Sequence, residues 1–187
     1  MKPIFLVHAG EYLAGSYIQD KFRHVNLWVP AKDTGIDLLV SDRANRQTVS
    51  LQVKFSKDFL VAHMRRQAPE FQSKLRACGW WKLNSEKVRR SCADYWVFVL
   101  QGFANTSVDY VVIPPQDLLR RLRHLHHGQQ KVWQVYLWVT KSERCWETRD
   151  LSKGDKLLIA GDKFSNPHRD FSEYLNAWEP VASLNQS

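Results

Sequence analysis

Apolar and polar residues alternate in the first third of the chain in a way that predicts a β-hairpin. An apolar run covers residues 36–40, and every second residue is apolar over residues 48–55. Alternation with a period of two is typical of a strand with one buried face. The stretch between them, residues 41–47, is polar and has the composition of a turn. We therefore expect two antiparallel strands joined by this turn.

Similar patterns along the rest of the chain predict a mixture of helices and strands. Helices are expected over residues 9–22, 70–78, 86–92, 116–127 and 166–178. Strands are expected over residues 25–30, 94–101, 109–114, 131–140, 144–149 and 157–160. Asn84 or Ser85 is the expected cap of the third helix, and Pro69 and Pro167 suit the first turn of the helices that they begin.

This order of elements predicts the α/β (α+β) class, with a central mixed sheet flanked by helices. The chain has 187 residues, of which 44% are hydrophobic, and eight of them are Trp, so a packed single domain is expected. We divide it into a core, residues 1–115, and a C-terminal extension, residues 116–187. The extension carries a strand hairpin and a helix, and we expect it to pack on the same domain.

The cysteines and the apolar runs indicate the cellular compartment in which the protein is expected. Cys78, Cys92 and Cys145 are odd in number, and none of them forms a CxxC pair. We expect free thiols in a reducing compartment, without a zinc site or a disulfide framework. No apolar run is long enough for a signal peptide or a transmembrane helix. A soluble, intracellular, cytoplasmic protein without a membrane partner is expected.

The formal net charge of +8 favours a polyanionic partner, because basic side chains release counterions from nucleic acid on binding. Basic residues that could contact phosphates lie after the second hairpin strand and on the expected helix over 116–127: Lys57, His63, Arg65, Arg66, Arg120, Arg121 and Arg123. The alternative is that these side chains form an ordinary solvated surface.

The candidate chemistry lies in the predicted hairpin. Asp37 can lie beside Gln52 and Lys54, which share one face of the second strand. A second carboxylate, Glu11, belongs to the first turn of the first helix, where it could also simply complement the helix dipole. Carboxylate and amide oxygens suit Mg²⁺, and a neighbouring amine can hold a water or stabilise charge on a phosphate. Gly35 allows a backbone shape that points Asp37 at the site.

Glu11, Gly35-Ile36-Asp37 and Gln52-Val53-Lys54 resemble, in order and spacing, the motif of the PD-(D/E)XK nuclease superfamily. The resemblance covers roughly residues 9–115 and is nearest to the restriction-endonuclease-like and Holliday-junction-resolvase-like branches. The chain departs from the usual motif at two positions: Gln52 stands where many members have an acid, and Ile36 replaces the proline.

The resemblance implies a fold and an activity. It implies an α-β-β-β-α-β core and a metal-dependent DNA endonuclease acting in repair, recombination, restriction or defence. Glu11, Asp37 and Gln52 would hold Mg²⁺ or Mn²⁺, and Lys54 would complete the catalytic set by orienting or activating water. Cleavage of two strands requires two active sites, so a homodimer or a higher homo-oligomer is expected.

Two other interpretations remain open at the level of sequence. The chain could be a nucleic-acid-binding or complex-assembly module that keeps this fold without cutting. Alternatively, Asp37 and Lys54 could form an ordinary exposed ion pair in a sheet, which contributes little.

Overall fold

The computed structural model describes residues 8–32, 34–57, 73–102, 107–126 and 130–185. In these residues the elements are α1 (Ala9–Lys21), β1 (Val25–Trp28), β2 (Leu38–Asp42), β3 (Thr48–Lys57), β4 (Leu75–Asn84), α4 (Ser85–Arg89), β5 (Tyr95–Gln101), β6 (Val108–Ile113), α5 (Pro115–Leu125), β7 (Val132–Thr140), β8 (Cys145–Glu147), α6 (Lys153–Ala160), η2 (Ser172–Tyr174), α7 (Glu179–Ala182) and η3 (Ser183–Asn185).

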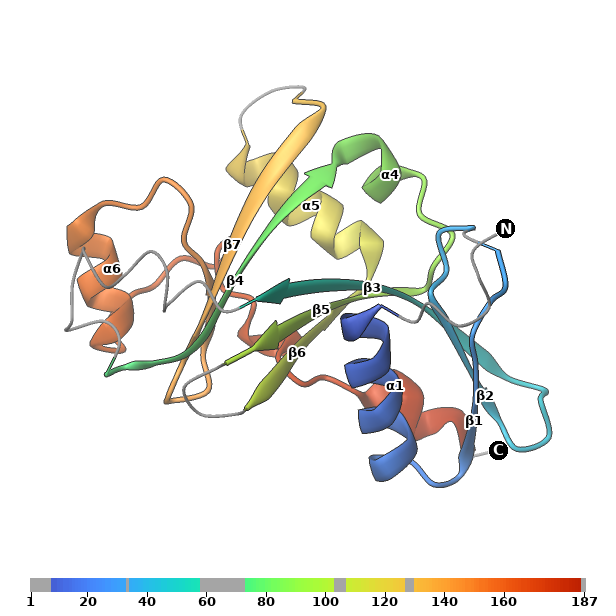
Figure 1. Ribbon diagram of the computed structural model, residues 1–187. Coiled ribbons are helices and arrows are strands. Elements are labelled where there is room, and N and C mark those ends of the chain that lie inside the picture. The colour runs from blue at the N-terminus through green and yellow to red at the C-terminus, as the bar shows by residue number, and fades with distance from the viewer. Residues whose placement is uncertain (1–7, 33, 58–72, 103–106, 127–129, 186–187) are drawn as a thin grey trace.

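The strands form two sheets (Figure 1). The central sheet has five strands in the order β1-β2-β3-β5-β6, and all neighbours are antiparallel except β3 and β5, which run parallel. A smaller antiparallel sheet has the order β4-β7-β8. The predicted fold class, a mixed central sheet flanked by helices, is confirmed.

The predicted hairpin is formed by β2 and β3, whose register runs from Leu38 opposite Leu51 to Ser41 opposite Thr48. Its turn is fixed by one side chain, because Asp42 Oδ1 accepts hydrogen bonds from the backbone N–H groups of Arg46 (2.7 Å) and Gln47 (3.0 Å). An Asx-type contact of this kind is the physical reason that polar segments form turns.

Helix α1 covers one face of the central sheet, and α5 together with the smaller sheet covers the other (Figure 1). Ala14 and Ile18 of α1 pack in one core cluster with Leu51 and other residues of the central strands. Leu118 and Leu122 of α5 pack in a second cluster with residues of β4, β5, β6 and β7. Residues from both sides of position 115 therefore share a core.

The smaller sheet is attached to the central sheet by partly buried polar contacts. Arg76 of β4 donates Nε and Nη2 to the two carboxylate oxygens of Asp109 in β6, at 2.9 and 2.5 Å. The backbone N–H of Trp80 donates to Ser56 Oγ of β3 at 2.9 Å. β4 thus lies beside β3, and β4 and α4 together face the part of β3 that extends beyond its pairing with β2.

The helix predicted over residues 70–78 is wrong in the part that the structure describes, because Leu75 to Cys78 begin β4. Leu75 and Cys78 have helical spacing, but both are buried here in a strand whose register shifts between Leu75 and Ala77. This irregularity disturbs the period-two pattern that identifies a strand.

The strand predicted over residues 157–160 is also wrong. These residues end helix α6, which begins with a capping box in which Ser152 Oγ accepts from the Asp155 backbone N–H at 3.1 Å. The single long helix predicted over residues 166–178 is wrong as well. Phe171, Tyr174 and Trp178 are buried as expected, but turns, the 3-10 helix η2 and isolated bridges carry them.

Candidate active site

A cleft of about 780 Å³ opens where β3 leaves its partner β2. The β2–β3 pairing ends at Leu51, whereas β3 continues beside β5 as far as Lys57. One edge of β3 therefore faces the cleft from Gln52 onward. The lining comes from α1, the entry to β2, β3, β4, α4 and β5.

Asp37 takes the place of a strand partner at this open edge. Its backbone N–H donates to the Leu51 carbonyl at 2.8 Å, and its Oδ2 accepts the backbone N–H of Val53 at 2.8 Å. Asp37 is only 9% exposed. The Lys54 ammonium lies 3.9 Å from the same Oδ2, so the predicted approach of Asp37 to Lys54 is confirmed.

The conformation of Gly35 brings the chain to this position. Its φ is +86°, in the left-handed region that residues with a Cβ rarely adopt. A Cβ added there would lie 3.4 Å from Cys92 Sγ, an ordinary contact, so the backbone conformation and not the space requires glycine. The predicted need for a glycine two residues before Asp37 is confirmed.

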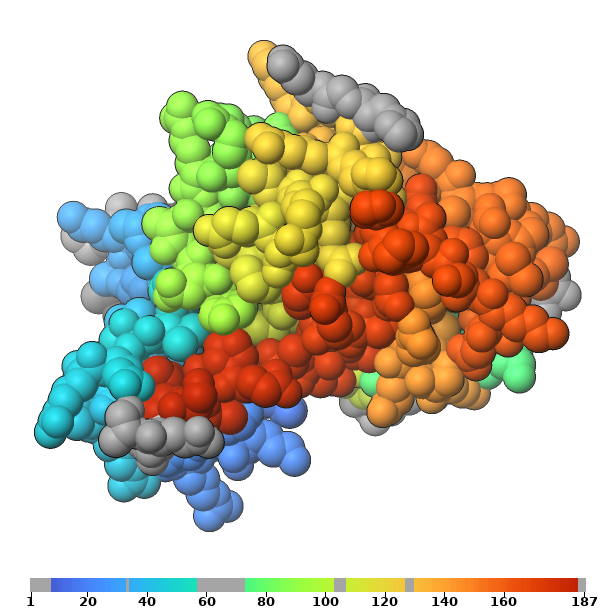
Figure 2. All heavy atoms as spheres, turned by 180° about the vertical axis from the view of Figure 1, so that it is seen from behind, coloured from blue at the N-terminus to red at the C-terminus, as the bar shows by residue number. Residues whose placement is uncertain are grey.

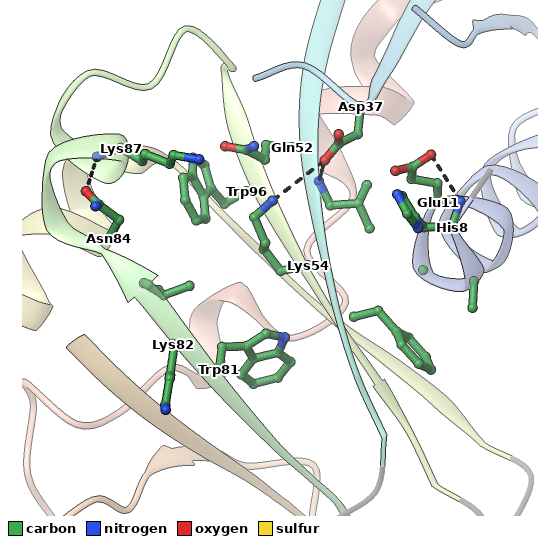
Figure 3. Close-up of a pocket in the computed structure, with 15 residues that line it drawn as sticks. His8, Glu11, Asp37, Gln52, Lys54, Trp81, Lys82, Asn84, Lys87 and Trp96 are labelled. Atoms are coloured by element: carbon green, nitrogen blue, oxygen red, sulfur yellow. Dashed lines mark hydrogen bonds and ion pairs between the residues drawn. The ribbon is translucent and has the colours of Figure 1, made fainter. Parts of the chain in front are cut away.

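Glu11 enters the cleft from the first turn of α1 and is 7% exposed. Its Oε2 accepts the His8 backbone N–H at 3.3 Å, as in a capping box. The expected place of Glu11 in the first turn of the first helix is confirmed. The carboxylate nevertheless lines the same cleft as Asp37, as Figure 3 shows, so the cap also fixes its position there.

Gln52 and Lys54 lie on the face of β3 that meets Trp96 and Phe98 of β5 in the parallel register. The Lys54 side chain is 31% exposed, and its ammonium lies 5.5 Å from the centroid of the Trp96 ring. An aromatic face stabilises a cation at this distance. Lys54 is thus held between a carboxylate and an aromatic ring, and the pair with Asp37 is not an ordinary exposed surface pair.

The opposite wall of the cleft is formed by β4 and α4, which were not predicted to belong to the site. Asn84 and Lys87 line it, and Figure 3 shows the side chain of Lys87 directed toward Gln52 and Trp96. Lys82 also lies on this wall, but its side chain turns away in the figure and its ammonium lies 5.5 Å from the Trp80 ring centroid. No local motif marks Lys87, because its place depends on how β4 returns beside β3.

The predicted phosphate-contacting residues lie in different environments. His63, Arg65 and Arg66 are outside the described residues, and Lys57 is the last residue of β3. On α5, Arg120 is exposed and forms a 2.7 Å pair with Asp117, and Arg123 is exposed beside a separate cavity.

The Arg121 side chain instead makes contacts within the protein. Its side chain is 11% exposed, pairs with Glu173, donates to the Pro167 carbonyl at 2.7 Å and lies 5.3 Å from the Phe171 ring centroid. Figure 2 shows α5 beside the C-terminal third of the chain, which these contacts join. The geometry of Arg121 therefore does not favour its predicted contact with phosphate.

The donor set fits a hard divalent cation. Mg²⁺ takes one or two protein carboxylates and keeps several waters. Glu11, Asp37 and the amide oxygen of Gln52 line one cleft, and one oxygen of each carboxylate is oriented by a backbone N–H. A cluster of three or more His, Cys, Asp and Glu side chains arranged for a metal was not found in the described ranges. The fit therefore rests on two acids, one amide and solvent.

Comparisons of the chain with protein-family models, with curated proteins and with solved structures found no match. Of the helices that the structure describes, none is both long enough and apolar enough to cross a membrane.

Proposed function

We propose that the protein is a metal-dependent DNA endonuclease that hydrolyses phosphodiester bonds. The observation that supports this most is the pairing of Asp37 and Lys54 at the open edge of β3, in a cleft that Glu11 also lines. Two acids with an amine beside one of them in the same cleft can hold a metal, a phosphate and a water together. The proposal agrees with the resemblance to PD-(D/E)XK nucleases.

Each side chain has a distinct role in this proposal. Glu11 and Asp37, with the Gln52 amide, would hold Mg²⁺ or Mn²⁺. The bound ion supplies a Lewis acid that stabilises charge on the phosphate and the leaving oxygen. Lys54 orients the attacking water and stabilises negative charge on the phosphate. Val53 holds Asp37 in place through its backbone N–H.

The net charge of +8 supports DNA as the partner. We propose a homodimer or higher homo-oligomer for cleavage of both strands, since each chain contributes one cleft. Cys78, Cys92 and Cys145 form no disulfide with one another in the part of the chain that the structure describes, which supports a reducing compartment such as the cytoplasm. Repair or recombination and restriction or defence are the two settings in which such an activity is expected.

The test is a cleavage assay with wild type beside Asp37→Asn and Lys54→Ala. Supercoiled plasmid, linear duplex, single strands and a four-way junction are each offered with Mg²⁺, Mn²⁺ or EDTA. We expect metal-dependent cleavage that either substitution slows by at least about a hundredfold, the scale of a lost acid–base or electrostatic group. Asp20→Asn and Lys21→Ala are matched controls, because both residues are exposed at the other end of α1. These two variants should cleave DNA like wild type.

The second candidate is a binding or assembly module with the same fold and no cleavage. The specific observation in its favour is that Gln52 lines the cleft without a negative charge. In the same assay it predicts no product with any substrate or metal, together with salt-sensitive binding that Asp37→Asn and Lys54→Ala leave unchanged.

A further inference from the structure

A second cavity of about 580 Å³ continues the cleft beyond Gln52. The two cavities share three lining residues, Gln52, Asn84 and Lys87, so they join along one line of side chains. Beyond this junction the second cavity is lined by Thr34, Gly35, Glu86, Arg90, Ser91 and Cys92. We call it the side groove.

We propose that the side groove binds the sugar–phosphate of the nucleotide next to the scissile phosphate, with Lys87 as the phosphate-contacting residue. This inference rests on the proposed function, and it assigns the path by which one nucleic-acid strand leaves the catalytic cleft. Cavities that hold a small ligand have volumes of roughly 300–1,000 Å³. The cleft and the side groove each fall in that range, so together they have room for more than one nucleotide.

The charged side chains follow one another along the joined cavities, with the acids apart from Lys87. Figure 3 shows the side chains in the order Glu11, Asp37, Lys54, Gln52 and Lys87 across the view. The acids that suit a metal are at one end, and the amine of Lys87 is at the junction with the side groove. A phosphodiester strand that meets a metal at the acids therefore meets a cation one step further along.

Lys87 is the cation that the local ion pairs leave for a ligand. Glu86, its neighbour in α4, pairs with Arg89 and Arg90 at 2.5 Å each. Among the described residues, the Lys87 ammonium takes no part in these ion pairs. The backbone N–H of Lys87 donates to Asn84 Oδ1 at 3.1 Å. The same contact caps α4 and fixes the base of the Lys87 side chain.

A native thiol reports whether the side groove is occupied. Cys92 lines the groove and is exposed, whereas Cys78 and Cys145 are buried. Its Sγ donates to the Thr34 carbonyl across the groove at 3.2 Å. Under native conditions a small alkylating reagent such as iodoacetamide should therefore react with Cys92 first, and a strand lying in the groove should slow that reaction.

The experiment measures the alkylation rate of Cys92 by mass spectrometry with and without a single-stranded thymidine oligonucleotide. Ca²⁺ replaces Mg²⁺ during labelling, and each variant is compared with itself, so that a direct effect of Lys87 on thiol reactivity cancels. Wild type, Lys87→Ala and Lys82→Ala are tested, because the two lysines lie on one wall and only Lys87 points into the cleft. Cys92→Ser confirms the labelled position.

We expect the oligonucleotide to slow Cys92 labelling in wild type and in Lys82→Ala, but much less in Lys87→Ala at the same concentration. Loss of one phosphate contact should weaken binding by about fivefold and reduce the slope of log K against log salt by about 0.7. The proposal is overturned if the oligonucleotide binds, by fluorescence anisotropy, while Cys92 reacts at its free rate. It is equally overturned if Lys82→Ala and Lys87→Ala weaken binding alike.

The same preparations assayed with Mg²⁺ separate this proposal from the proposed function. Cleavage without protection of Cys92 keeps the nuclease and removes the side groove from the strand path. Protection that depends on Lys87, without cleavage of any substrate, keeps the groove as a binding site and removes the nuclease.

Discussion

Gly10 of α1 lies so close to Phe55 of β3 that a Cβ on Gly10 would sit 2.7 Å from the Cβ of Phe55. Glu11 is the next residue, so the spacing between helix and strand also sets where its carboxylate lies. Gly10→Ala should push α1 away from β3. We expect unfolding free energy to fall by about 1–3 kcal/mol, as in other overpacked cores. Cleavage should fall by about tenfold or more, because a displacement of about 1 Å can cost up to a hundredfold.

The matched control for this change is Gly154→Ala in the first turn of α6. A Cβ there would meet Ser152 Oγ at 3.6 Å, an ordinary contact. We expect a change of less than about 1 kcal/mol, in the stabilising direction, since alanine is the better helix former. Chemical denaturation followed by circular dichroism measures both variants, and equal effects at the two glycines would contradict the close-packing argument.

Gln52→Glu should strengthen metal binding, because it adds a carboxylate to the two that line the cleft. The magnesium concentration that gives half-maximal cleavage should fall by about fivefold or more, which corresponds to roughly 1 kcal/mol of added attraction at short range. Titration of Mg²⁺ in the cleavage assay measures this. Gln134→Glu adds the same charge on β7 outside the residues that line the cleft, and an equal shift in that variant would point to a general charge effect.

Arg169→Met should destabilise the fold strongly, because Glu147 is 1% exposed and its Oε2 accepts from Arg169 Nη1 at 2.7 Å. Burial raises the pKa of Glu147 to about 7, although Arg169 and two backbone N–H groups favour the charged form. Removing the partner of a buried charge typically costs about 3–5 kcal/mol. The cost should be largest above pH 7 and smaller at pH 5, where the carboxyl group is protonated.

Arg120→Met is the control for that variant, because the Arg120 side chain is 70% exposed in its pair with Asp117. A surface pair of this kind contributes about 0–1 kcal/mol. Urea denaturation at pH 5 and pH 8 gives both comparisons. A pH-independent loss in Arg169→Met would mean that Glu147 does not carry the effect.

His126 should make stability fall as the pH falls. Burial, and then the nearby charge of Arg149, lower the pKa of His126 from its ordinary value of 6.5. The ring stacks on Trp133, and its Nδ1 lies 3.3 Å from Arg149 Nη1, a contact that suits the neutral ring. Below pH 6.5 the unfolded chain binds a proton that the folded chain does not bind, so unfolding is favoured.

The measurement is the unfolding free energy of wild type and His126→Phe between pH 5 and pH 8. The wild type should lose stability relative to the variant as the pH decreases, by at most about 1.4 kcal/mol per pH unit. Parallel curves for the two proteins would show that this ring does not titrate on unfolding.

Elements whose apolar residues recur with a clear period could be predicted from the sequence. Elements in which tertiary packing disturbs that period could not. The alternation of β3 and the apolar stripe of α5 identify their elements because each has one buried and one exposed side. The start of β4 lacks the period of two that identifies a strand, because the register shift after Leu75 buries both Ala77 and Cys78. The C-terminal segment has core residues at helical spacing, but they pack from turns and short 3-10 segments.

The residues of the candidate site show the same difference between local and tertiary contacts. Asp37 directly precedes β2 and Lys54 lies on β3, and a short turn joins these two strands, so a hairpin alone brings the two residues together. Lys87 reaches the cleft because β4, which pairs with β7 in the smaller sheet, lies beside β3 of the central sheet. A contact that depends on the meeting of two sheets has no local signature in sequence, so the wall formed by β4 and α4 could not be predicted.

The open edge of β3 also bears on the solubility of the protein. No described strand pairs with β3 on the cleft side after Leu51, and an uncovered edge can template pairing with a strand from another molecule. Asp37 occupies the Val53 N–H with a charged group, and Lys54 places a second charge beside it. The two side chains proposed for catalysis thus also discourage intermolecular strand addition. An apolar replacement of Asp37 would remove that protection along with the proposed activity.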